Sequence, residues 1–263
     1  MFPASGFSIL TDRARPKTFG RKTRFLLHPI ACHREATVDR LSVLHSAIVL
    51  LLKTAQRAKF DLADDALFYD QPRFVTHVDE GFIDRLTQLY RDRLTPEMHV
   101  FDMMSSWVSH LPSDVKFARV EGHGMNAEEL AKNPRFDRYF VQNLNQNQTL
   151  PKADTEFDAV LNTVSVQYLE QPEAIFSEIF RILKPGGVAI ISYSNRMFYQ
   201  KAIQAWRDTS EKSRVALVER YFANAGFERI ETVAHVSSQP PVLQMLGFGS
   251  SDPFYATIGY RPA

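Results

Sequence analysis

The spacing of apolar residues along the chain predicts four helices. Apolar positions recur every three to four residues after Asp79 and again after Pro172, a period typical of amphipathic helices. Asn126 is suited to begin a short helix, because Glu129 stands at the reciprocal capping position. The helices expected from these patterns span residues 79–94, 127–132, about 172–183 and about 210–225.

Short apolar runs between these helices predict seven strands. The run at 188–193 is almost continuously apolar, and the turn Lys184-Pro-Gly-Gly187 separates it from the helix before it. Apolar strands that alternate with crossover helices predict a doubly wound α/β fold, in which helices cover both faces of a mainly parallel sheet. The expected strands are 98–102, 116–120, 138–141, 157–162, 188–193, 228–235 and 254–260.

Composition excludes several classes of protein. The chain has 263 residues with 31 basic and 30 acidic side chains, so its net charge gives no general attraction to nucleic acid or to an anionic membrane. Its single cysteine, Cys32, excludes an intrachain disulfide and a multi-cysteine metal site. No pair of histidines has metal-ligand spacing with an acidic or cysteine partner, so we expect no metal.

Charge is distributed unevenly, and this predicts a division near residue 60. Residues 1–60 carry 11 basic and 3 acidic side chains, which favours a basic extension that is partly disordered or forms a short helix. Residues 61–263 form the predicted folded domain. The apolar run at 43–52 has ten residues, about half of what a membrane span needs. We expect a cytoplasmic protein, or one imported into a plastid or another organelle if the basic extension is a targeting segment.

One long run of sequence carries a family resemblance. The segment FDAVLNTVSVQYLEQPEAIFSEIFRILKPGGVAIISYSN, residues 157–195, resembles the fourth-to-fifth-strand region of class I S-adenosylmethionine-dependent methyltransferases of the type 11 domain group. The resemblance extends over about 95–260 and implies a Rossmann-like sheet whose last strand is antiparallel. SSWVSHLP at 105–112 also resembles a subgroup of methyltransferase-like proteins from photosynthetic lineages.

The cofactor motif of this family is altered after the first predicted strand. The acidic residue is present as Asp102, but the usual glycine positions are Met104, Ser106 and Val108. Side chains there keep the backbone farther from a ligand than glycines do. Ser105 and Ser106 offer hydroxyl and backbone N–H groups, which could hold a carboxylate if a short helix begins there.

The resemblance also indicates where the rest of the cofactor would lie. The acid that holds the ribose hydroxyls in the family is replaced by Gly124, and Glu121 could substitute only if the strand end is displaced. Asn143 stands where an acid near the adenine is expected, and its carbonyl can accept the same hydrogen bond. The expected cofactor contacts are Asp102, Ser105, Ser106, Gly122, Gly124, Asn143 and Asn162, with Tyr69 and Arg73 closing over them.

Candidate catalytic groups are few, because a sulfonium methyl group is already activated and needs alignment more than chemical assistance. His77, His110 and His123 are weak candidates for a base, and solvated loop histidines are the plainer interpretation. Arg73 is suited either to pair with a ligand carboxylate or to form a surface ion pair with Asp70 or Asp79.

Two functions remain open. The first is methyl transfer from S-adenosylmethionine to a small-molecule acceptor, without nucleic acid or a membrane span. The second is a non-catalytic binding or regulatory module that keeps the methyltransferase fold, and the missing glycines favour it.

Overall fold

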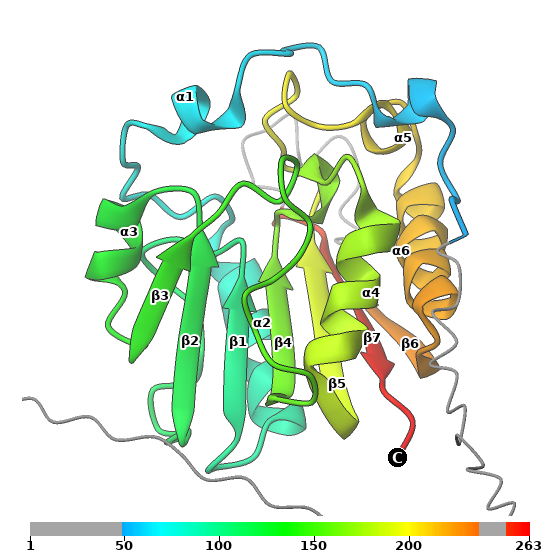
Figure 1. Ribbon diagram of the computed structural model, residues 1–263. Helices are drawn as coiled ribbons and strands as arrows, with labels where there is room; N and C mark the ends of the chain where they lie inside the picture. Colours follow the sequence, from blue (N-terminus) through cyan, green and yellow to red (C-terminus); the bar gives the residue numbers. More distant parts are fainter. Residues whose placement is uncertain (1–48, 237–250) are drawn as a thin grey trace, which may run out of the picture. The chain divides into compact units, whose positions relative to one another are not determined.

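The protein is described by a computed structural model, which covers residues 49–236 and 251–263. Seven strands form one sheet in the order β3-β2-β1-β4-β5-β7-β6 (Figure 1). Strands β1 to β5 are parallel, and β7 is antiparallel to both β5 and β6. This confirms the predicted fold class. The strands are β1 His99–Met103, β2 Arg119–Gly124, β3 Arg138–Val141, β4 Phe157–Thr163, β5 Leu183–Tyr193, β6 Glu228–His235 and β7 Phe254–Tyr260.

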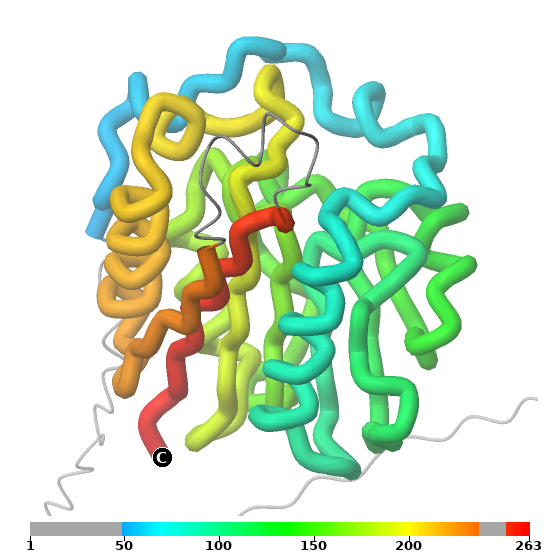
Figure 2. Tube along the Cα trace, turned by 180° about the vertical axis from the view of Figure 1, so that it is seen from behind, coloured from blue at the N-terminus to red at the C-terminus, as the bar shows by residue number. Residues whose placement is uncertain are grey.

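Helices cover both faces of the sheet, as Figures 1 and 2 show from opposite sides. Helices α4 and α6 pack on one face together with Phe101, whereas α2 packs on the other face with the neighbouring residue Val100. This alternation follows from the two-residue period of a strand. The helices are η1 Thr54–Arg57, α1 Asp65–Tyr69, α2 Glu80–Arg93, α3 Ala127–Lys132, η2 Val166–Tyr168, α4 Pro172–Ile182, α5 Gln204–Arg207 and α6 Glu211–Ala225.

Side-chain caps begin three of these helices, and the cap at Asn126 was predicted from the sequence. The side chains of Asp79, Asn126 and Ser210 accept hydrogen bonds from the first turns of α2, α3 and α6. Helix α6 ends at Gly226, which adopts the left-handed conformation with a φ of 93°. None of the helices in the described ranges is long and apolar enough to cross a membrane.

Three local predictions were wrong. Strand β2 lies at 119–124 instead of 116–120, because residues 121–124 all pair with β3, and the first two also with β1, despite their weak strand propensity. The loop directly after β1, residues 104–112, contains no helix, and positive φ angles at Met104 and His110 interrupt that segment. The residues 184–187 form a bulge within β5, not a turn before it: β4 pairs with Leu183 and then next with Val188.

Residues 58–78 run across the carboxyl edge of the sheet, above the ends of the parallel strands (Figure 1). We call this segment the strap. It contains the short helix α1, which the sequence pattern did not predict. The predicted basic extension falls largely on residues 1–48, outside the described residues, so the proposed boundary near residue 60 stays a prediction.

Candidate functional site

A cavity of about 320 Å³ lies at the carboxyl edge of the sheet, between the strand ends and the strap. Its volume falls within the range of about 300–1,000 Å³ that is typical of small-molecule sites. The cavity brings together seven of the nine expected cofactor contacts and all three candidate histidines. These lining residues are Tyr69, Arg73, His77, Asp102, Ser105, Ser106, His110, His123, Gly124 and Asn143.

Asp102, next to the last residue of β1, lines the cavity and is 2% exposed. Burial raises the pKa of this carboxyl to about 7, although hydrogen bonds from Ser109 and Ser105 oppose the shift. The Ser105 hydroxyl donates to Asp102 Oδ2 at 2.8 Å. Near neutral pH this acid therefore exists in both protonation states.

His123 fastens the loop after β1 to β2. Its Nδ1 accepts a hydrogen bond from the Met104 N–H at 3.1 Å, and its Nε2 contacts the Gln142 carbonyl at 3.0 Å. The Ser105 N–H donates to the His123 carbonyl at 2.7 Å. Burial lowers the pKa of His123 to about 4, so the ring is neutral. Both ring nitrogens are therefore used in structure, which leaves no free nitrogen for a substrate.

The two glycines of β2 are needed for packing. A side chain at Gly124 would place its Cβ 2.5 Å from the Ser105 carbonyl oxygen, and one at Gly122 would meet the Phe136 ring at 2.3 Å. The loop after β1 thus crosses directly over the end of β2. Gly122 does not line the cavity, so we do not retain it as a ligand contact.

Helix α3 places Glu129 in the cavity wall with 8% exposure. Its Oε2 accepts a hydrogen bond from the Ser106 hydroxyl at 2.6 Å, and its Oε1 accepts one from the backbone N–H of Arg73 at 2.6 Å. The expected reciprocal cap is absent, because this carboxylate turns toward the strap. Asn126 also holds the strap, since its Nδ2 donates to the Tyr69 and Asp70 carbonyls at 2.9 and 3.0 Å.

Ser105 and Ser106 differ from expectation in one respect. Their hydroxyls already donate to the chain's own carboxylates, Asp102 and Glu129. The Ser105 N–H is also taken, by the His123 carbonyl. These groups shape the wall, and they do not form the helix N-terminus that the sequence predicted for a ligand carboxylate.

Arg73 extends from the strap into the cavity. Its guanidinium lies 4.6 Å from the Phe68 ring centre and 5.6 Å from that of Phe198, and it donates to the Phe68 carbonyl at 2.8 Å. Within the described ranges it forms no ion pair, so neither Asp70 nor Asp79 is its partner. The cation is available for an anionic group of a ligand.

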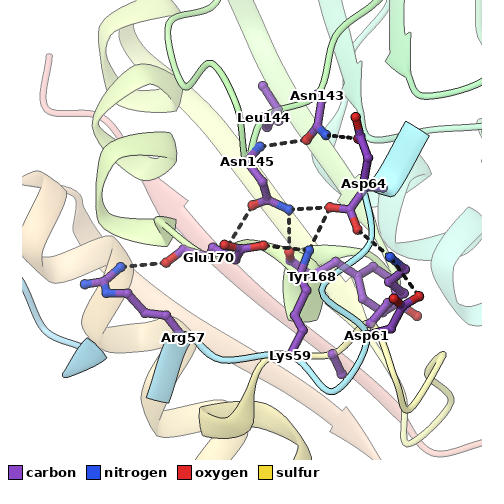
Figure 3. A network of polar contacts seen from close by, with 12 residues as sticks. Arg57, Lys59, Asp61, Asp64, Asn143, Leu144, Asn145, Tyr168 and Glu170 are labelled. Carbon is purple, nitrogen blue, oxygen red and sulfur yellow. Dashed lines mark hydrogen bonds and ion pairs between the residues drawn. The ribbon is translucent and has the colours of Figure 1, made fainter. Parts of the chain in front are cut away.

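A polar cluster, which we call the clasp, fixes the strap to the segments that follow β3, β4 and β5 (Figure 3). Asp65 accepts from Lys59 Nζ at 2.7 Å, from Asn145 Nδ2 at 2.9 Å, and pairs with Lys201 Nζ at 3.2 Å. Each lysine contacts a second acid as well. The clasp comprises Lys59, Asp61, Asp65, Asn145, Glu170 and Lys201.

The two expected asparagine contacts have different surroundings. Asn143 lines the cavity, but its Oδ1 accepts from the Asn145 N–H at 2.9 Å. Asn162 is fully buried within β4, where its Nδ2 donates to the Met103 carbonyl at 3.3 Å. Asn162 does not line the cavity, so we do not retain it as a ligand contact.

His77 and His110 line the cavity and keep their imidazoles outside the hydrogen-bonded framework of the described residues. Burial lowers the pKa of His110 to about 4 and also lowers that of His77, whose ring lies 5.3 Å from Phe198. Both rings are neutral at neutral pH. Each could accept a proton, His110 only weakly.

Part of the chain is similar to known methyltransferases. Residues 116–191 match the family described as a methyltransferase domain. The biotin biosynthesis bifunctional protein BioHC of Teredinibacter turnerae is 32% identical over 110 residues, which cover 42% of this chain and 18% of that protein. A Mycolicibacterium smegmatis protein named "Probable S-adenosylmethionine-dependent methyltransferase" is 31% identical over 90 residues, 32% of this chain and 34% of that protein. The chain thus spans about a third or less of these relatives.

Among solved structures, a methyltransferase in complex with the Haloferax volcanii Trm112 methyltransferase activator has the same fold. It superposes with a TM-score of 0.50 at 15% identity, over 70% of this chain and 93% of the other. The sheet order and this likeness assign the chain to the Rossmann-like methyltransferase fold, within which residues 116–191 match the methyltransferase domain.

Proposed function

We propose that the protein binds S-adenosylmethionine in this cavity and transfers its methyl group to a small-molecule acceptor. The fold and the matched domain support the proposal, because in open α/β sheets ligands bind outside the carboxyl ends of the strands. The cavity occupies that position and extends over the ends of β1, β2, β3 and β4.

The charge of the cavity is the observation that carries the proposal. Asp102 and Glu129 face the cavity without a cationic partner in the described chain, and Arg73 faces it without an anionic one. The other charged groups of the wall are paired: Asp65 with two lysines, and Arg196 with Asp252. These two acidic side chains and one arginine complement a ligand with two positive charges and one negative charge. S-adenosylmethionine has an ammonium, a sulfonium and a carboxylate.

The chain's own residues would align and shield the reaction. When bound, the cofactor supplies an electrophilic methyl group that needs in-line approach by the acceptor. Trp107, Phe198 and Val78 give this cavity apolar walls that exclude water, and Trp107 is fixed by donating from Nε1 to the Val75 carbonyl at 3.2 Å. His77 and His110, both neutral, are the groups placed to take a proton from an acceptor.

Calorimetric titration with S-adenosylmethionine and S-adenosylhomocysteine tests the proposal. We expect saturable binding of both ligands and tighter binding of S-adenosylmethionine, because only its sulfonium adds a positive charge. Arg73→Gln should weaken both by about tenfold, the loss expected for one charge-assisted hydrogen bond. The matched control is Arg91→Gln, which changes an exposed arginine paired with Asp114 on the outer surface.

The non-catalytic alternative rests on the crowded loop after β1. Met104 and Ser105 have their N–H groups committed to His123, where a glycine loop would leave them free. If the wild-type protein binds neither ligand at millimolar concentration, a binding free energy weaker than about −4 kcal/mol, the binding module replaces the enzyme. If it binds, transfer of isotope-labelled methyl groups into a small-molecule extract measures activity.

A further inference from the structure

The Glu129 carboxylate is the buried acid whose position in the cavity the family pattern does not explain. It is 8% exposed and forms no ion pair with a described residue. Its two oxygens accept one hydrogen bond each, from the Arg73 N–H and the Ser106 hydroxyl, both at 2.6 Å. An ionised carboxylate has about four acceptor sites, so two remain for a ligand.

Neither Gly124 nor Glu121, the two positions considered for a ribose-binding acid in the sequence, supplies an acid to the cavity. Gly124 has no room for a side chain, because the Ser105 carbonyl oxygen lies 2.5 Å from where its Cβ would stand. Glu121 is 2% exposed and is held by Lys152 and by Arg138, the latter at 2.9 Å. Glu121 does not line the cavity. The end of β2 therefore contributes no acid to the site.

We propose that Glu129, displaced from the strand to the following helix, binds the vicinal hydroxyls of the cofactor's ribose. This inference rests on the proposed function and names the residue that would recognise the sugar. Glu129 reaches the cavity beside Gly124, because α3 directly follows β2. Arg73 and Ser106 orient its carboxylate from two sides, and two hydroxyl donors match its two remaining acceptor sites.

The test compares S-adenosylhomocysteine with its 2′-deoxy and 3′-deoxy analogues on wild-type protein and on Glu129→Gln. On wild type, loss of either hydroxyl should weaken binding by about tenfold, as expected for a hydrogen bond to a charged group. Glu129→Gln should weaken binding of S-adenosylhomocysteine by a similar factor. It should weaken each deoxy analogue by a smaller factor than S-adenosylhomocysteine, because one of the two hydroxyls that Glu129 holds is already missing.

A purely structural role for Glu129 gives a different pattern. If the carboxylate only holds the strap, Glu129→Gln weakens all three ligands by the same factor, and the inference is overturned. Lys59→Gln is the control, since it loosens the strap through Asp65 and Glu170, away from the helix that carries Glu129, and should affect all three ligands equally.

The wild-type measurements remain decisive if Glu129→Gln does not fold. Equal affinity of wild type for S-adenosylhomocysteine and both deoxy analogues overturns the role of Glu129 while leaving the proposed function intact. Absence of binding by any ligand, S-adenosylmethionine included, overturns the proposed function and this inference with it.

Discussion

Removal of the charge at the centre of the clasp should detach the strap from the sheet. In Asp65→Asn, Lys59 and Lys201 lose a shared partner while both remain buried, at 8% and 1% exposure. The new amide keeps an oxygen that can accept from Asn145, so the shape of the cluster is preserved. The substitution therefore isolates the ionic contribution of Asp65.

The expected cost is about 3 kcal/mol, the low end of the roughly 3–5 kcal/mol seen when one partner of a buried ion pair is removed. The low end applies because each lysine keeps another acid: Glu170 lies 2.9 Å from Lys59, and Asp61 lies 3.0 Å from Lys201. For a domain of this size, that cost corresponds to a fall in melting temperature of roughly 6–12 °C.

The pH of the measurement follows from the pKa of Asp65. Burial alone would raise this pKa, but hydrogen bonds from Lys59 and Asn145 outweigh it and hold the pKa below 3.8. A carboxyl whose pKa is lowered by folding stabilises the protein at pH values above its pKa in the unfolded chain. This stabilisation is lost as the pH falls through the lower pKa of the folded state. Thermal unfolding at pH 7.5 therefore measures the full effect.

Thermal unfolding and limited trypsin digestion together test the clasp. Asp65→Asn should melt lower than wild type and be cleaved faster within the strap, after Lys59 or Arg73. The control is Asp114→Asn, whose exposed pair with Arg91 is worth at most about 1 kcal/mol. If the two variants melt together and the strap resists trypsin equally, the clasp does not hold the strap.

Three further outcomes are expected. Affinity for S-adenosylmethionine should increase from pH 6 to 8 as Asp102, with its pKa of about 7, becomes ionised, and Asp102→Asn should flatten that profile. Gly124→Ala should lower the free energy of unfolding in urea by about 1–3 kcal/mol, because its Cβ would meet the Ser105 carbonyl; an unchanged midpoint contradicts this. Burial holds the pKa of His123 at about 4, so stability present above pH 6.5 should fall toward pH 4, and His123→Gln should remove part of that acid sensitivity.

Most of the fold could be predicted because its signals are local. The helix at Pro172 and the strand at Val188 are marked by strong apolar patterns, and β3, β6 and β7 lie where the sequence placed them. Strand β2 was misplaced for a physical reason. Its residues 121–124 are Glu, Gly, His and Gly, and they are strand because β3 pairs with all four and β1 also pairs with the first two.

The site was harder to predict because its contacts are distant in sequence. Lys59, Asn145 and Lys201 resemble ordinary solvated polar residues until the fold brings them to Asp65. Glu129 stands three residues after Asn126, a spacing that predicts a reciprocal helix cap. Only the position of the strap shows that its carboxylate belongs to the cavity wall instead. A buried acid three residues after a capping asparagine is a signal that could be searched for.

The strap is held in part by residues far along the chain, so these contacts form late during synthesis. The strap leaves the ribosome before any strand of the sheet, yet Lys201 Nζ donates to the Ala63 carbonyl across a separation of 138 residues. At about 5–20 residues per second, the partner of Ala63 follows roughly 7–28 s later. During that interval the strap has only its nearer contacts, such as those to α3, and the clasp is completed only after β5 and the loop that follows it have been made.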